Sequence, residues 1–180
     1  MTTTALVQIP FPALAELAVG RPLADVEIVI TTTNSSYHGQ TEFRIRPGVV
    51  DADTVELFGF SQCTVLARAM NERTGWAFTL VEQFIDGAWT WAHVGVLTPA
   101  GRMLDIHGVR ELGEVESQML AEYGHPARVR VLPTLAALAD AITPGSSVQH
   151  WTSDITNTMG VEIVAVLAEL LTVQASEGGA

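Results

Sequence analysis

Alternating apolar and polar positions along the chain predict an antiparallel sheet. The clearest period-two pattern lies at 41–46, and the β-branched stretch 25–31 precedes it across a long polar turn. Asp86-Gly87 is a strong hairpin signal between two further strands. We expect strands at residues 25–31, 41–46, 78–85, 89–97, 102–107 and 128–132.

Apolar residues at spacings of three and four predict helices around these strands. The central helix spans about 62–74, with Ser61 as its N-cap, Gly75 just past its C-terminus and Cys63 at the start of its apolar stripe. Residues 161–173 are apolar nearly all round, which is typical of a deeply buried helix or of one in a subunit interface. Further helices are expected at 12–19, at 111–123 and after the cap Thr134, along Leu135, Leu138 and Ile142.

The order of these elements predicts one α+β domain over residues 25–174. In this domain the central helix packs on the antiparallel sheet, and additional helices follow toward the C-terminus. A loosely structured arm, 1–24, precedes the domain, a loop is expected at 143–152, and a disordered tail, 175–180, ends the chain.

Composition narrows the classes of function. The 180 residues carry a formal net charge of -11, and all nine basic residues are arginine, which argues against nucleic acid or an anionic membrane as a partner. No run reaches the roughly 18 apolar residues that a membrane span needs. One cysteine cannot form an internal disulfide, and the N-terminus lacks the basic start of a secretory signal, so we expect a cytoplasmic protein.

The single cysteine lies where a reactive thiol would be placed. Cys63 begins the central helix, and His93 and Asp105 follow on two adjacent strands. A helix dipole and a nearby imidazolium both favour the thiolate, which is the nucleophilic form. Taken singly, Cys63 also fits a buried structural cysteine and His93 a packed histidine. Asp105 is costly in an apolar strand unless a partner such as His93 pairs with it.

Pairing between His93 and Asp105 depends on one turn. If residues 99–101 form a three-residue loop, His93 faces His107, and Asp105 lies diagonal to His93 at about 7–8 Å between backbones. A loop of two or four residues would shift the register by one and turn Asp105 to the opposite face of the sheet. The hypothesis therefore requires an odd-length turn.

Three neighbours complete the expected site. Gln62 and the Cys63 backbone N–H can bind an oxyanion, or Gln62 faces solvent at the helix start. Trp91 shares a face with His93 and is expected to form a cleft wall, while His107 either supports His93 or ends its strand. A mixed metal site is a further alternative, but no closely spaced ligand pair supports it. We expect neither a metal nor a cofactor.

Three segments resemble the papain-like cysteine hydrolases in the broad sense, which include the NlpC/P60 and transglutaminase-like groups. They are 62–70, 92–96 and 101–108, and they are also similar to uncharacterised actinobacterial and phage proteins. The resemblance implies a nucleophilic cysteine on a helix packed against a sheet, followed by histidine and a third polar residue. The chain has Val94 and Gly95 where transglutaminase-like members often carry an aromatic residue, and Gln62 adjoins the cysteine instead of preceding it by several residues.

The leading expectation is therefore a cysteine-dependent hydrolase or acyltransferase that acts on an amide or related acyl bond. Cys63 would attack the carbonyl, His93 would carry the proton, and Asp105 would orient the imidazole. The substrate would be a peptide or another amide, a host protein among the candidates. The alternative is a non-catalytic binding or assembly protein that uses 161–173 as a partner or homodimer surface.

Overall fold

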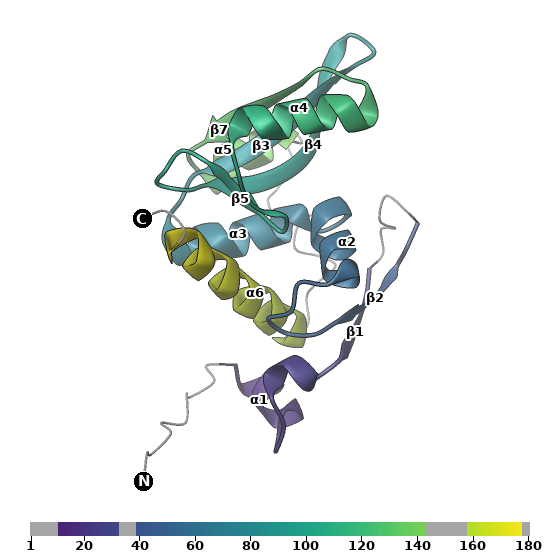
Figure 1. The fold of residues 1–180 in the computed structure, drawn as a ribbon, viewed down its shortest axis with the longest axis vertical. Coiled ribbons are helices and arrows are strands. Elements are labelled where there is room, and N and C mark those ends of the chain that lie inside the picture. The colour runs from purple at the N-terminus through teal and green to yellow at the C-terminus, as the bar shows by residue number, and fades with distance from the viewer. Residues whose placement is uncertain (1–10, 33–38, 143–157, 178–180) are drawn as a thin grey trace.

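The protein is a mixed α+β structure built on a five-stranded antiparallel sheet (Figure 1). The computed structural model describes residues 11–32, 39–142 and 158–177. The strand order is β6-β5-β4-β3-β7, and β1 and β2 form a separate antiparallel pair. The strands are β1 (Ile28–Thr31), β2 (Glu42–Ile45), β3 (Phe78–Ile85), β4 (Ala88–Leu97), β5 (Met103–Asp105), β6 (Gly108–Arg110) and β7 (Ala127–Leu132).

Helices pack against the sheet from both faces. They are α1 (Pro12–Leu17), α2 (Ala52–Phe60), α3 (Cys63–Thr74), α4 (Leu112–Tyr123), α5 (Leu135–Ile142) and α6 (Thr158–Glu177), with a short 3₁₀ turn at Leu23–Asp25. On one face, Leu66 and Met70 of α3 are buried in the main core together with residues of α6. On the other face, Val115 of α4 packs on Val81 and Met103.

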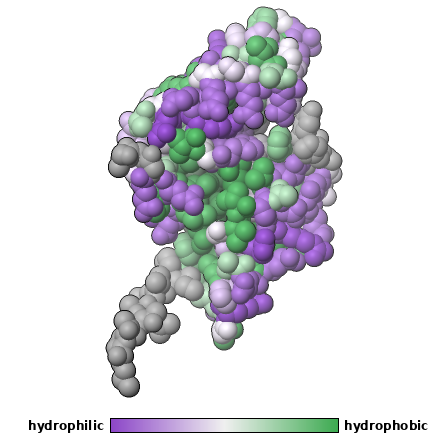
Figure 2. Space-filling view, viewed as in Figure 1, coloured by the Kyte–Doolittle hydropathy of each residue, from purple (hydrophilic) through white to green (hydrophobic). Residues whose placement is uncertain are grey.

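Hydrophilic and apolar side chains on the surface follow this layering. On the face seen in Figure 2, hydrophilic side chains cover α4, and apolar side chains gather over the middle of the molecule, where α3 and α6 lie. Helix α6 contributes to both the core and this surface: Ile163, Leu167 and Leu171 are buried, whereas Val161 and Val173 are exposed. Among the helices of the described ranges, none combines the length and apolarity required to cross a bilayer.

The central helix and most predicted elements are confirmed, but α2 was not predicted. Asp51 caps α2 by accepting a hydrogen bond from the Thr54 backbone N–H at 3.1 Å. Because α2 ends at Phe60, the predicted loop before Cys63 shrinks to Ser61 and Gln62. The predicted N-cap Ser61 is wrong by one residue: Gln62 holds that position, without a side-chain cap.

The odd-length turn between β4 and β5 is confirmed. Val96 pairs with Leu104, and Leu97 pairs with Met103. The Thr98 backbone N–H then donates to the Arg102 carbonyl at 2.8 Å, which leaves a loop of three residues, 99–101. This register places Asp105 diagonal to His93, as the pairing hypothesis requires.

The strand predicted at 102–107 is shorter than expected. It ends at Asp105, and a two-residue turn leads into β6, so that Asp105 pairs with Gly108. Gly108 has a φ of +93°, a conformation that residues with a Cβ rarely adopt. Gly108 is therefore the first residue of a returning strand and does not stop a longer one.

A β-bulge corrects the expected arrangement of Trp91 and His93. His93 pairs with Val81, but Trp91 pairs with Glu82, so the register shifts between Val81 and Glu82. Successive residues of β3 point to opposite faces, and their partners must do the same. Trp91 and His93 therefore lie on opposite faces of the sheet, and the prediction that they share one is wrong.

The N-terminal arm is anchored from Pro12 onward. Glu162 of α6 accepts hydrogen bonds from the backbone N–H groups of Ala13 and Leu14, at 3.1 and 2.8 Å, and Leu14 is fully buried. The predicted tail is helical as far as Glu177, because α6 continues to that residue. Residues 1–10, 178–180 and the predicted loop 143–152 lie outside the described residues.

Candidate active site

Cys63 is the first residue of α3 and is 5% exposed. A tight turn brings it there: the N–H groups of Ser61 and Gln62 both donate to the Leu57 carbonyl at the end of α2. The Gln62 carbonyl in turn accepts from Val65 and Leu66 inside α3. The N–H of Cys63 belongs to the first turn of the helix, which has no intrahelical acceptor.

His93 lies at an open edge of the sheet. Strand β5 pairs with β4 only at Val96 and Leu97, so within the described residues no strand pairs with β4 on that side at His93. The imidazole Nε2 lies 2.8 Å from Asp105 Oδ2, and the Cys63 side chain lies close enough to the ring to affect its pKa. Because Nε2 is engaged with Asp105, Nδ1 is the ring nitrogen left to exchange a proton with the thiol.

The Asp105 carboxylate, only 1% exposed, accepts hydrogen bonds from three donors. Oδ2 accepts from His93 Nε2 and from Arg110 Nη2, and Oδ1 accepts from the His107 backbone N–H at 2.8 Å. A buried carboxylate is tolerated when its oxygens are paired in this way. The side chain is therefore held from three sides with one oxygen against His93.

Arg110 is the site residue that sequence reasoning missed. It lies on β6 opposite Met103, and only 15% of its side chain is exposed. Its Nη2 contacts Asp105, while its Nη1 donates to Gln118 Oε1 of α4 at 2.8 Å. The sequence signal for this role was the turn before Gly108. After that turn, β6 returns alongside β5 and places Arg110 near Asp105.

Electrostatics favour an ionised pair at His93 and Asp105. Burial lowers the pKa of His93, but the hydrogen bonds to Asp105 and Cys63 and the charges of both outweigh it and raise the pKa from 6.5 to about 10. Burial raises the pKa of Asp105, but the hydrogen bond and charge of His93, followed by the charges of Arg110 and His107, bring it below 3.8. At neutral pH this histidine is an imidazolium beside a carboxylate.

His107 lies beside this pair without joining it through its ring. The imidazole is exposed, 6.2 Å from the His93 ring and 6.3 Å from the Phe60 ring between centroids. Burial lowers the pKa of His107; Asp105 raises it, and the charges of Arg110 and His93 lower it further. His107 is thus an uncharged imidazole at neutral pH on the rim of the site.

Gln62 and Trp91 are close to the site residues in sequence. The Gln62 side chain is buried, and its Nε2 donates to Ser61 Oγ at 3.4 Å. Trp91 is 39% exposed and lies on the same face of the sheet as its partner Glu82. The structure therefore brings together Cys63, His93 and Asp105, with Gln62 adjoining the cysteine, and it places Trp91 on the opposite face of the sheet from His93.

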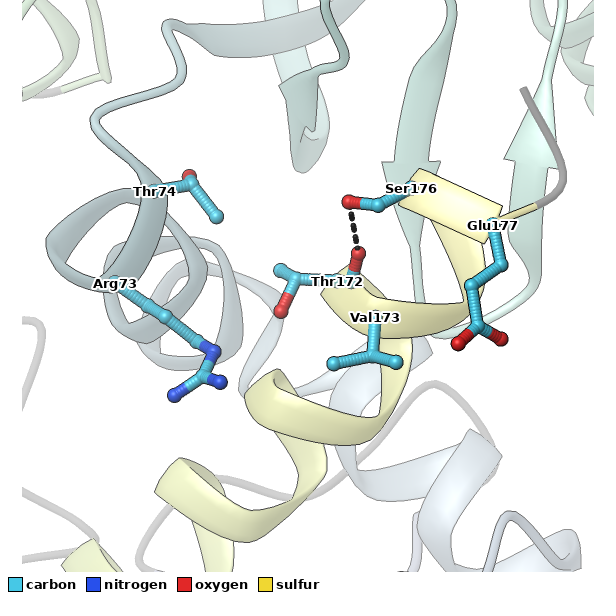
Figure 3. Close-up of a pocket in the computed structure, with 6 residues that line it drawn as sticks. All are labelled: Arg73, Thr74, Thr172, Val173, Ser176 and Glu177. Carbon is cyan, nitrogen blue, oxygen red and sulfur yellow. Dashed lines mark hydrogen bonds between the residues drawn. The ribbon is translucent and has the colours of Figure 1, made fainter. Parts of the chain in front are cut away.

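A hollow in the surface lies at the opposite end of α3. Its volume is about 540 Å³, and it is formed by the C-terminal turns of α3 and α6 (Figure 3). Arg73 is ten residues after Cys63, which corresponds to about 15 Å along a helix. The hollow is therefore separate from the cysteine. It is lined by Arg73, Thr74, Thr172, Val173, Ser176 and Glu177.

The described residues hold no group of three or more His, Cys, Asp or Glu side chains arranged to bind a metal ion. Comparison with protein-family models, with curated protein sequences and with solved structures gave no match. The candidate chemistry therefore depends on the geometry of the site itself.

Proposed function

We propose that this protein is a cysteine-dependent hydrolase or acyltransferase with a papain-like arrangement, acting on an amide or related acyl bond. The observation that carries the proposal is one connected chain of side chains. The Cys63 side chain lies close enough to the His93 imidazole to raise its pKa, and Nε2 of the same ring lies 2.8 Å from the buried Asp105 carboxylate. Nucleophile, base and orienting acid are the three parts of such a catalytic centre.

The first half of the reaction forms a thioester. The Cys63 sulfur, as a thiolate beside the His93 imidazolium, attacks the substrate carbonyl carbon and forms the S–C bond. The negative charge moves to the carbonyl oxygen, where the Cys63 N–H at the N-terminus of α3 can stabilise it. His93 then donates its proton to the leaving amine as the C–N bond breaks.

The second half regenerates the enzyme. His93, now neutral, removes a proton from water or from an acceptor amine, which attacks the thioester carbonyl. The C–S bond breaks, and the thiolate and imidazolium pair is restored. Asp105 holds the ring in position during both proton transfers, and Arg110 and the His107 N–H hold Asp105. Hydrolysis, deamidation and acyl transfer share this thioester.

Alkylation by iodoacetamide at pH 7 tests the nucleophile without a known substrate. The described residues contain one free cysteine, so all labelling reports Cys63. We expect His93→Ala to reduce the labelling rate by at least about tenfold, because the imidazolium that favours the thiolate is lost. His125→Ala is the matched control and should label at the wild-type rate. Equal rates in wild type and His93→Ala would refute the proposal.

A further inference from the structure

Three exposed aromatic side chains lie together on the β3–β4 hairpin, which reaches the top of Figure 1. Phe84 pairs with Trp89, with ring centroids 5.3 Å apart, and Glu82 pairs with Trp91 on the same face. Each of the three is between 38% and 40% exposed. We call Phe84, Trp89 and Trp91 the aromatic shelf.

The aromatic shelf continues the sheet face on which α3 packs. Along β3, alternate residues share a face, so Phe78 and Leu80 precede Glu82 and Phe84 on it. Phe78 and Leu80 are fully buried in the core that includes Cys63. The shelf therefore begins where the packing of α3 stops, at the end of the helix that carries the thiol.

The shelf is also adjacent to the catalytic histidine along the strand. Trp91 precedes His93 by two residues, a separation of about 7 Å in an extended chain, and the His93 ring contacts the Cys63 thiol. Trp91 and His93 lie on opposite faces of β4, so the shelf shares its face of the sheet with α3, the helix that begins at Cys63, and borders the stretch of β4 that carries the imidazole.

A fixed charge cluster borders the shelf. Glu82, 5% exposed, pairs with Arg128 at 2.6 Å and with Arg130 at 3.0 Å, and the Arg128 guanidinium lies 4.1 Å above the Trp89 ring. Two guanidinium groups face one carboxylate, so this cluster carries one net positive charge in a chain whose net charge is -11. It favours a neutral or acidic ligand over a basic one.

We propose that the aromatic shelf is a substrate subsite, which binds a large aromatic side chain of a neutral or acidic polypeptide next to the acyl group attacked by Cys63. The inference rests on the proposed function. Exposed clusters of large aromatic residues mark ligand and protein contacts, since tryptophan offers much apolar area at little loss of conformational entropy.

Three acetylated dipeptide chloromethyl ketones test the subsite: Glu-Phe, Glu-Gly and Lys-Phe. Each forms a bond from the Cys63 sulfur to the methylene carbon and releases chloride, so the second-order rate of mass increase measures binding beside the thiol. We expect the Glu-Phe reagent to label about tenfold faster than Glu-Gly, and several-fold faster than Lys-Phe at low salt.

Variants of the shelf locate the effect. Trp91→Ala and Trp89→Ala should each bring the Glu-Phe to Glu-Gly ratio toward one while leaving the iodoacetamide rate unchanged. Val131→Ala removes an exposed apolar side chain from the opposite face of β7 and should keep the wild-type ratio. A wild-type ratio near one, or a ratio that survives both tryptophan variants, would overturn the subsite. Loss of the His93 dependence of iodoacetamide labelling would instead overturn the proposed function.

Discussion

The two ends of α3 differ in how their polar groups are bonded. At the C-terminal end, beside the hollow, the Thr74, Thr172 and Ser176 hydroxyls donate to carbonyls one turn back in their own helices. At the N-terminal end, side chains from α3, β4, β5 and β6 bond to one another. The hollow therefore lies where the polar groups are already satisfied locally, and the connected titratable groups at the other end of α3 are buried.

The hollow at the C-terminal end of α3 therefore does not mark the candidate chemistry in this fold. Side chain to backbone bonds within one helix stabilise that helix and leave no nucleophile or base poised for reaction. Bonds between side chains of different strands fix mutual orientation, which is what proton transfer requires. Deleting one member of a charged pair at each end of α3 tests whether the two kinds of bonding stabilise the fold to different extents.

Removing Asp105 should have the largest effect on stability. Asp105→Ala leaves the largely buried Arg110 without its carboxylate and removes the partner of the His93 imidazolium. We expect the free energy of unfolding to fall by about 3–5 kcal/mol, as is typical when one member of a buried ion pair is deleted. Urea denaturation measures the change.

The matched control lies at the other end of α3. Glu169 pairs with Arg73 at 3.5 Å, and both side chains are nearly half exposed. Glu169→Ala should lower the free energy of unfolding by less than about 1 kcal/mol, because exposed pairs contribute little. Similar losses in the two variants would show that the N-terminal network has no special role.

His93 should also make the stability of the protein depend on pH. The folded-state pKa of His93 is raised from 6.5 to about 10, so its contribution is complete below pH 6.5 and is lost as the pH rises toward 10. In that interval the free energy of unfolding should fall by up to about 1.4 kcal/mol per pH unit. The lowered pKa of Asp105 acts only in acid, as the pH falls below 3.8.

Urea denaturation of wild type and His93→Gln between pH 6 and pH 10 measures this slope. The variant has no group that titrates at this position, so its curve should be flatter in the same interval. If the two curves had the same slope, His93 would not be the group that links stability to pH.

The core of the site could be predicted from the sequence because the relevant signals are local. The start of α3, the Asp86-Gly87 turn and the three residues 99–101 are short-range features, and they determine which residues of β4 and β5 lie side by side. Turn length decides the parity of the pairing, so the approach of Asp105 to His93 follows from the number of residues in one loop.

Two features of the site escaped prediction for different reasons. The bulge between Trp91 and His93 arises where β3 and β4 pair over their full length, and no residue type at Ala92 marks it. The β5–β6 hairpin was missed because Gly108 fits the end of a strand as well as the start of one. As a result Arg110, which contacts Asp105, was left unassigned.

Acylation of Cys63 by p-nitrophenyl acetate is the decisive measurement for the proposed nucleophile and base. We predict a burst of one nitrophenolate per chain, an acetyl group on Cys63 by mass spectrometry, and steady release afterward as the thioester is hydrolysed. In His93→Ala both phases should be slowed by at least about a hundredfold. An acetyl group that forms equally fast without His93, or none on Cys63, would contradict catalysis by this pair.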